Sequence, residues 1–254
     1  MKLFYRELGE GEPLIILHGV FGSADNWLTV SKELTTTYKL YLLDQRNHGL
    51  SPKSDVFTYS AMADDLKEFM EDHSIKKATV IGHSMGGKVV MKFASLYPDL
   101  LKKMVVVDIS PRYYHPHHQN ILKGLLSLNL KELKTRQEAD EQLSTYVPAL
   151  AERQFLLKSL FRNQNNEFEW RINLPVINAQ IENIGEALDV NIRINLPTLF
   201  IRGSESKYIQ EKDEELIRQL FTNVEIKTVQ GSGHWVQAEK PKEFLEILKP
   251  FLQA

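Results

Sequence analysis

Residues 78–87 read ATVIGHSMGG, an apolar run followed at once by the pattern Gly-x-Ser-x-Gly around Ser84. The run has no polar alternation, which is typical of a strand covered on both faces. The residues after Ser84 favour a helix that ends before Pro98. A serine on such a sharp strand-to-helix turn projects its hydroxyl above the sheet, with glycines giving the crossing chain room. The stretch therefore predicts a nucleophilic serine.

Similar apolar runs recur along the chain and alternate with helical patterns. Helical patterns begin near Ser60, which we expect to be an N-cap, and cover 85–96, 211–220 and 242–252. This alternation favours an open, mostly parallel sheet flanked by helices. The other expected strands lie at 14–17, 40–43, 104–107, 197–201 and 224–229.

The alternation stops between Arg112 and Asn195. Amphipathic helical patterns cover 121–128, a helix that Thr135 begins with Glu138 in a capping box, and 149–161, with a short β-like piece at 168–172. We expect residues 1–111 and 196–254 to form one core domain and residues 112–195 to form a helical lid. The lid contains ten Lys or Arg and ten Asp or Glu residues, so no excess charge marks a site for the phosphates of coenzyme A.

Composition excludes several classes of protein. The formal net charge is −2, which gives no reason to expect a nucleic-acid or anionic membrane partner. With no cysteine there is no disulfide, thiolate metal site or cysteine nucleophile. The charged N-terminal residues and the short apolar runs predict neither a signal peptide nor membrane insertion, so we expect a cytoplasmic protein.

A serine hydroxyl needs a general base, and in this arrangement the acid and then the histidine follow the serine in the chain. Of the eight histidines, four precede Ser84 and three open the lid, at 115, 117 and 118. His234 remains, between the last strand and a helix. We expect His83 to be a packing residue and the three lid histidines to lie in a solvated loop, because no carboxylate or thiolate nearby completes a metal site.

The third member of the triad is an acid, and two residues compete for the role. The usual position, after the strand at 197–201, holds Ser206, with Glu205 beside it. Asp108 ends the preceding strand, and adjacent strands lie only about 5 Å apart. The acid orients the imidazole, which restricts its distance and not its strand. Geometry favours Asp108, with Glu205 as the alternative.

An oxyanion hole must also stabilise the charge that develops on the carbonyl oxygen. The N–H of Met85, directly after the nucleophile, is one expected donor. The turn after the 14–17 strand is expected to supply the other, from Val20.

Residues 18–23, 44–51, 82–88 and 233–236 together resemble the α/β-hydrolase superfamily, and most closely its small serine esterase branch. The resemblance implies a lid inserted between the sixth and seventh strands of that fold and the triad Ser84, Asp108 and His234. It implies hydrolysis of esters or thioesters, including acyl-CoA, without cofactor or metal, on a small-molecule substrate. Rival interpretations are a carbon–carbon bond hydrolase or lyase with the same triad, and a non-catalytic ligand sensor.

Overall fold

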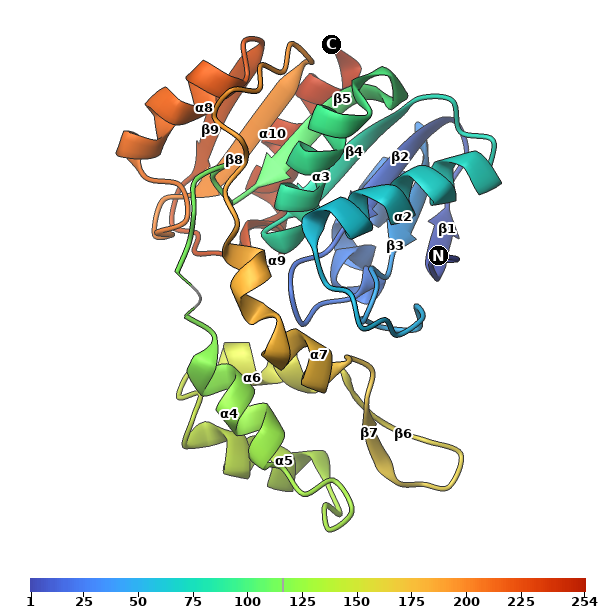
Figure 1. The fold of residues 1–254 in the computed structure, drawn as a ribbon, viewed down its shortest axis with the longest axis vertical. Helices are drawn as coiled ribbons and strands as arrows, with labels where there is room; N and C mark the ends of the chain where they lie inside the picture. The colour runs from blue at the N-terminus through green and yellow to red at the C-terminus, as the bar shows by residue number, and fades with distance from the viewer. Residues whose placement is uncertain (116) are drawn as a thin grey trace.

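A computed structural model describes residues 1–115 and 117–254 of the chain (Figure 1). Its centre is a seven-stranded sheet in the order β1-β3-β2-β4-β5-β8-β9. All neighbouring strands in this sheet are parallel except β1, which pairs antiparallel with β3. The strands are β1 (Tyr5–Leu8), β2 (Glu12–Leu17), β3 (Tyr38–Leu43), β4 (Ala78–His83), β5 (Leu101–Val107), β8 (Thr198–Gly203) and β9 (Val224–Val229).

Helices cover both faces of the sheet, as its almost wholly apolar central strands require. One face packs on α2 (Tyr59–Asp72), α3 (Met85–Leu96) and α8 (Glu214–Leu220). Figure 1 shows α2 and α3 side by side in front of the sheet. The opposite face packs on α1 (Leu28–Ser31) and α10 (Pro241–Gln253), with α9 (Val236–Glu239) beside it. The fold is the α/β-hydrolase arrangement that the sequence predicts.

The six apolar runs all form strands. One further strand was not predicted, and two predicted helix caps need correction. The first strand, β1, is absent from the prediction because its YREL sequence carries no apolar run. The N-cap of α2 is Thr58, whose hydroxyl accepts a hydrogen bond from the Ala61 N–H, and Ser60 lies inside the helix. In the insertion Thr135 is the N-cap, but the Glu138 carboxylate accepts from the Lys134 N–H instead of closing a capping box.

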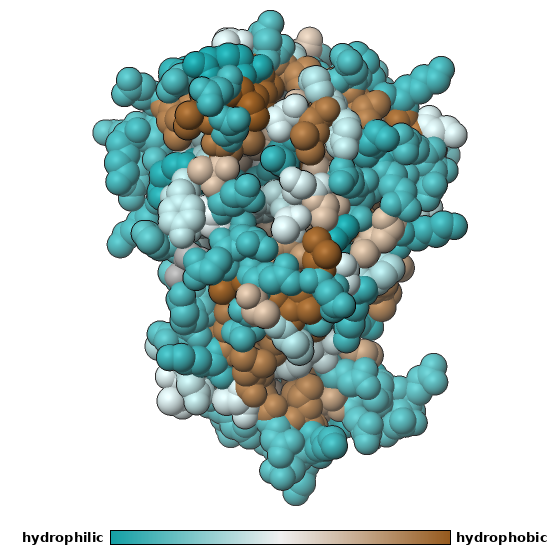
Figure 2. Space-filling view, in the orientation of Figure 1, coloured by the Kyte–Doolittle hydropathy of each residue, from teal (hydrophilic) through white to brown (hydrophobic). Residues whose placement is uncertain are grey.

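Between β5 and β8 the described residues leave the sheet and form four α-helices, a short 3-10 helix (Ile181–Gly185) and a hairpin, below the sheet in Figure 1. Apolar side chains gather over the middle of this insertion, with polar ones around them (Figure 2). The buried Lys88 amine donates to the carbonyls of Arg112 and Glu186, which ties together the two segments that enter and leave the insertion. The elements are α4 (Gln119–Ser127), α5 (Arg136–Ser144), α6 (Leu150–Leu157), β6 (Leu160–Arg162), β7 (Phe168–Trp170) and α7 (Leu174–Ala179).

Within the described part of the chain, every helix is too short or too polar to cross a bilayer.

Candidate active site

Ser84 lies on the turn between β4 and α3, with φ 53° and ψ −119°. A non-glycine residue in this region is strained, which is expected of a serine held above a sheet on a sharp turn. The positions on either side of this turn accept only glycine, because a Cβ atom there would collide with main-chain oxygens. A Cβ on Gly82 would lie 2.2 Å from the Gly86 carbonyl oxygen, and one on Gly86 would lie 2.5 Å from that of Leu17. The backbone therefore crosses itself where no side chain fits.

The structure brings Ser84, His234 and Asp108 together at the carboxyl ends of the strands. Ser84 Oγ lies 3.1 Å from His234 Nε2, and His234 Nδ1 lies 2.7 Å from Asp108 Oδ2. Glu205 is exposed, and its backbone N–H donates a hydrogen bond to the Ser232 carbonyl. Of the two acids that the sequence allows, Asp108 is the one in contact with the imidazole.

Asp108 is fully buried just beyond β5, with φ 50°. Its Oδ1 accepts a hydrogen bond from the Gly203 N–H, and its Oδ2 accepts one from the Ser206 hydroxyl as well as facing His234. Burial raises the pKa of the carboxyl, and the hydrogen bonds from Ser206 and Gly203 oppose that rise. Ser206 stands where the acid of the fold usually lies in the sequence, and its hydroxyl stabilises the Asp108 carboxylate instead.

The environment of His234 keeps its imidazole neutral. Burial, with a smaller contribution from the nearby His117, lowers the pKa of His234 to about 3. The Tyr208 ring stacks on the imidazole, with 3.9 Å between ring centroids and 19° between planes. A neutral imidazole whose Nδ1–H is held by a carboxylate leaves Nε2 free to accept a proton. His234 therefore has the protonation state of a general base.

Val20 and Met85 line a small cavity together with Ser84. Neither main-chain N–H donates a hydrogen bond to any residue among those described. Met85 is the first residue of α3, where the N–H groups of a helix have no partner within it. Both donors are thus available to an oxyanion.

Two buried histidines hold the loop that carries Val20. The Phe21 N–H donates to His48 Nε2, and the Gln45 N–H donates to His18 Nε2. Both rings must be neutral to accept, and burial lowers the pKa of His18 to about 4 and that of His48 to about 3. Phe21 itself has φ 63°, so the loop is strained and needs this support.

A cavity of about 380 Å³ opens above Ser84 between the sheet and the insertion. The insertion lines it with Ile121, Val147 and Leu156, and also with His117 and His118. His117 is exposed in a loop, as expected, although it also lines this cavity, whereas His118 is half-buried, so the expectation of a solvated position is wrong for His118. His117 Nε2 lies 2.7 Å from the Tyr208 hydroxyl, and burial lowers the pKa of His118 to about 3.

All three residues that the structure brings together around Ser84 are predicted from the sequence. The side chains that line the cavity are not, because no sequence pattern marks them. His83, expected to pack, is buried with Nε2 2.9 Å from the His234 carbonyl oxygen. No group of three or more His, Cys, Asp or Glu side chains that could hold a metal ion occurs among residues 1–115 and 117–254.

This fold and this serine site define a class, the α/β hydrolases, and the model of the alpha/beta hydrolase fold family matches residues 12–241. The chain belongs to this family. It is 36% identical to Esterase YbfF of Escherichia coli K12 over 241 residues, covering 94% of this chain and 92% of that protein. That match confirms the resemblance to the small esterase branch.

Two further relatives agree with this placement. The sn-1-specific diacylglycerol lipase ABHD11 of Danio rerio is 38% identical over 253 residues, covering 96% of this chain and 80% of that protein. The solved structure of a marine microorganism esterase superposes with a TM-score of 0.96 at 41% identity, covering 98% of this chain and 99% of that chain.

Proposed function

We propose that this chain is a carboxylesterase that cleaves carboxylic esters or thioesters, acyl-CoA among them, through an acyl-enzyme. The observation that carries the proposal is the continuous contact from Ser84 Oγ through His234 to the buried Asp108. Nucleophile and base lie within hydrogen-bond distance, and the base is oriented by a third group. The esterase and lipase names of the relatives agree with ester hydrolysis.

In the proposed mechanism His234 Nε2 takes the proton of Ser84 as Oγ attacks the substrate carbonyl carbon. The N–H groups of Val20 and Met85 stabilise the oxyanion. Asp108 stabilises the imidazolium without taking its proton. The imidazolium then protonates the leaving alcohol or thiol, which leaves an ester between the acyl group and Ser84. Water, deprotonated by His234, hydrolyses that ester and regenerates the enzyme.

We infer that residues 112–195 act as a lid that supplies the substrate pocket, while 1–111 and 196–254 form the catalytic core. The apolar side chains that the insertion turns toward Ser84 suit an acyl chain. The cavity above Ser84 has room for a short or medium chain, so we expect activity to decline for long acyl groups.

The test is hydrolysis of p-nitrophenyl esters from acetate to palmitate, and of butyryl-N-acetylcysteamine as a neutral thioester. Ser84→Ala should abolish turnover, while Ser144→Ala, on the exposed surface of the insertion, should not change it. Intact-protein mass spectrometry of a rapidly quenched reaction should detect one acyl group on the wild type and none on Ser84→Ala. Full activity of Ser84→Ala would overturn the proposal.

If the wild type hydrolyses none of these substrates, the proposal fails, and carbon–carbon bond cleavage or ligand sensing with the same residues becomes the hypothesis to test.

A further inference from the structure

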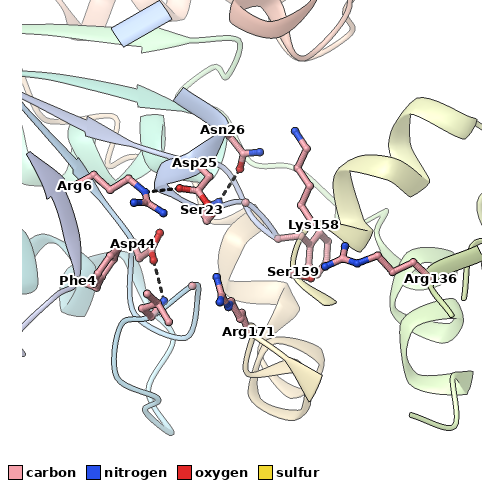
Figure 3. Close-up of a pocket in the computed structure, with 14 residues that line it drawn as sticks. Phe4, Arg6, Ser23, Asp25, Asn26, Asp44, Arg136, Lys158, Ser159 and Arg171 are labelled. Carbon is pink, nitrogen blue, oxygen red and sulfur yellow. Dashed lines mark hydrogen bonds and ion pairs between the residues drawn. The ribbon is translucent and has the colours of Figure 1, made fainter. Parts of the chain in front are cut away.

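A second cavity lies between the edge of the sheet and the insertion, on the other side of the 18–23 turn from Ser84. Its volume is about 270 Å³. Three cations of the insertion line it, namely Arg136 at the start of α5, Lys158 at the end of α6 and Arg171 after β7. Figure 3 shows them on one side of the pocket and the core residues Arg6, Asp25 and Asp44 on the other. We call this cavity the cationic pocket.

The three cations of the insertion have no carboxylate partner among the described residues. Arg136 donates to the carbonyls of Leu157 and Leu160, which leaves its charge uncompensated. The Lys158 ammonium has no hydrogen bond or ion pair among these residues. The Arg171 guanidinium likewise makes no side-chain hydrogen bond, and its Nε is buried without a partner. Arg136 and Lys158 are exposed, and Arg171 is half-buried with its guanidinium 4.8 Å from the centre of the Phe161 ring, so all three charges are open to a ligand that enters the pocket.

The core side of the cationic pocket does not neutralise this charge. Asp25 is already paired with Arg6, whose Nε lies 2.5 Å from Asp25 Oδ1. The buried Asp44 accepts hydrogen bonds from the N–H groups of Ala24 and Leu50, and burial raises the pKa of its carboxyl. Four cationic and two acidic side chains line the pocket, an excess of two positive charges.

A third cavity, which we call the connecting cavity, adjoins both the cationic pocket and the cavity above Ser84. Asn26 and Lys158 line both the cationic pocket and this connecting cavity. Phe155 and Trp235 line both the connecting cavity and the cavity above Ser84. The three cavities therefore adjoin one another in series between the core and the insertion, and we call this series the groove; its middle is mostly apolar and its far end is cationic.

The connecting cavity meets the cavity above Ser84 at Trp235, whose ring centroid lies 5.9 Å from that of the His234 imidazole. Because His234 must protonate the leaving group, the alcohol or thiol half of the substrate lies on this side. The acyl half is then left with the apolar wall of the insertion. The far end of the groove therefore receives the distal part of the leaving group.

We propose that the cationic pocket binds a phosphate monoester carried by the alcohol or thiol half of the substrate. The proposal rests on the esterase function proposed above. A phosphate monoester carries a charge near −2 at neutral pH, which matches the excess in the pocket. Its oxygens can accept from the planar fork of Arg171 and from the Lys158 ammonium.

The experiment compares two esters that differ only in the phosphate, 1-butyrylglycerol and 1-butyrylglycerol 3-phosphate. Arg171→Gln and Lys158→Gln should each raise KM for the phosphorylated ester about tenfold, the loss expected for one charge-assisted hydrogen bond. KM for the neutral ester should not change. Lys131→Gln removes an exposed lysine of the insertion outside the pocket and should alter neither value.

A second comparison identifies the source of the phosphate. Butyryl-CoA and butyryl-N-acetylcysteamine form the thioester pair, and the pair with the larger KM difference indicates which phosphorylated leaving group the pocket suits. Equal KM values within both pairs, or equal losses in Lys131→Gln and the pocket variants, would overturn the proposal.

Binding is measured apart from turnover by calorimetric titration of Ser84→Ala with glycerol 3-phosphate, with glycerol as control. Saturable binding that Arg171→Gln abolishes is expected. If the neutral ester is not hydrolysed but glycerol 3-phosphate still binds, the esterase function fails and the pocket stands. If the neutral ester is hydrolysed and glycerol 3-phosphate does not bind, the pocket proposal fails alone.

Discussion

Replacing Asp108 with asparagine is expected to inactivate the enzyme while leaving the fold intact, because of how the carboxyl is held. Oδ1 accepts from the Gly203 N–H, whereas Oδ2 faces the rotatable Ser206 hydroxyl and His234 Nδ1. An asparagine amide nitrogen in the place of Oδ1 would face the Gly203 N–H, which can only donate. In the place of Oδ2 the nitrogen would face the Ser206 hydroxyl and His234 Nδ1, which can both accept a hydrogen bond.

The asparagine amide should therefore donate to His234 Nδ1 and place the imidazole proton on Nε2. That nitrogen can then no longer accept the proton of Ser84. The same change of tautomer in a serine protease triad lowers kcat about 10⁴-fold, which corresponds to about 5 kcal/mol of transition-state stabilisation. We expect a loss of this order in p-nitrophenyl butyrate hydrolysis. The thermal midpoint should stay within about 3 °C of wild type, since the Gly203 N–H keeps its acceptor and the amide N–H groups can donate to Ser206 Oγ and His234 Nδ1.

Glu205→Gln is the matched control, because it makes the same chemical change on the neighbouring loop. It should keep wild-type kcat. If Asp108→Asn retained more than about a tenth of the wild-type kcat, a loss of under about 1.4 kcal/mol, while Glu205→Gln lost activity, the assignment of the triad acid would be wrong.

Substitutions at three other positions test the surroundings of the triad. Ser206→Ala removes a hydrogen bond that lowers the pKa of the triad carboxyl, so the acid limb of the kcat/KM profile should move to higher pH. Gly86→Ala forces a Cβ to 2.5 Å from the Leu17 carbonyl oxygen, and urea unfolding should show a loss of about 1–3 kcal/mol. Tyr208→Ala should lower kcat about three- to tenfold by freeing the His234 ring, whereas Tyr208→Phe should not, since the stack contributes about 0.5–1.5 kcal/mol.

The pH dependence of the wild type follows from the same pair of groups. Burial raises the pKa of Asp108, and proton uptake by the Asp108–His234 pair removes the base. Because the unprotonated pair is the active form, kcat/KM should be lost as the pH falls through the pKa of that pair, above the usual range of a carboxyl, and should be constant at moderately higher pH. An acid limb unchanged by Ser206→Ala would contradict this account.

Much of the fold and of the triad could be predicted from short stretches of sequence. Apolar runs mark strands buried on both faces, and Gly82 and Gly86 mark a crossing that only glycine permits. The choice between Asp108 and Glu205 needed three-dimensional contact, since both follow strands that lie side by side. His117 and His118 enter the pocket wall only because the insertion folds back over Ser84, and nothing in their sequence spacing indicates that.

The cationic pocket shows why the net charge of a segment is a poor guide to ligand binding. The insertion has as many acidic as basic residues, which predicts no phosphate site. Arg136, Lys158 and Arg171 come from three separate elements, and the fold places them around one cavity with their charges unpaired. Several acids of the insertion are engaged elsewhere, as Asp140 is with Arg153. An electrostatic site depends on which charges remain unpaired at one place, and in this chain tertiary structure alone determines that.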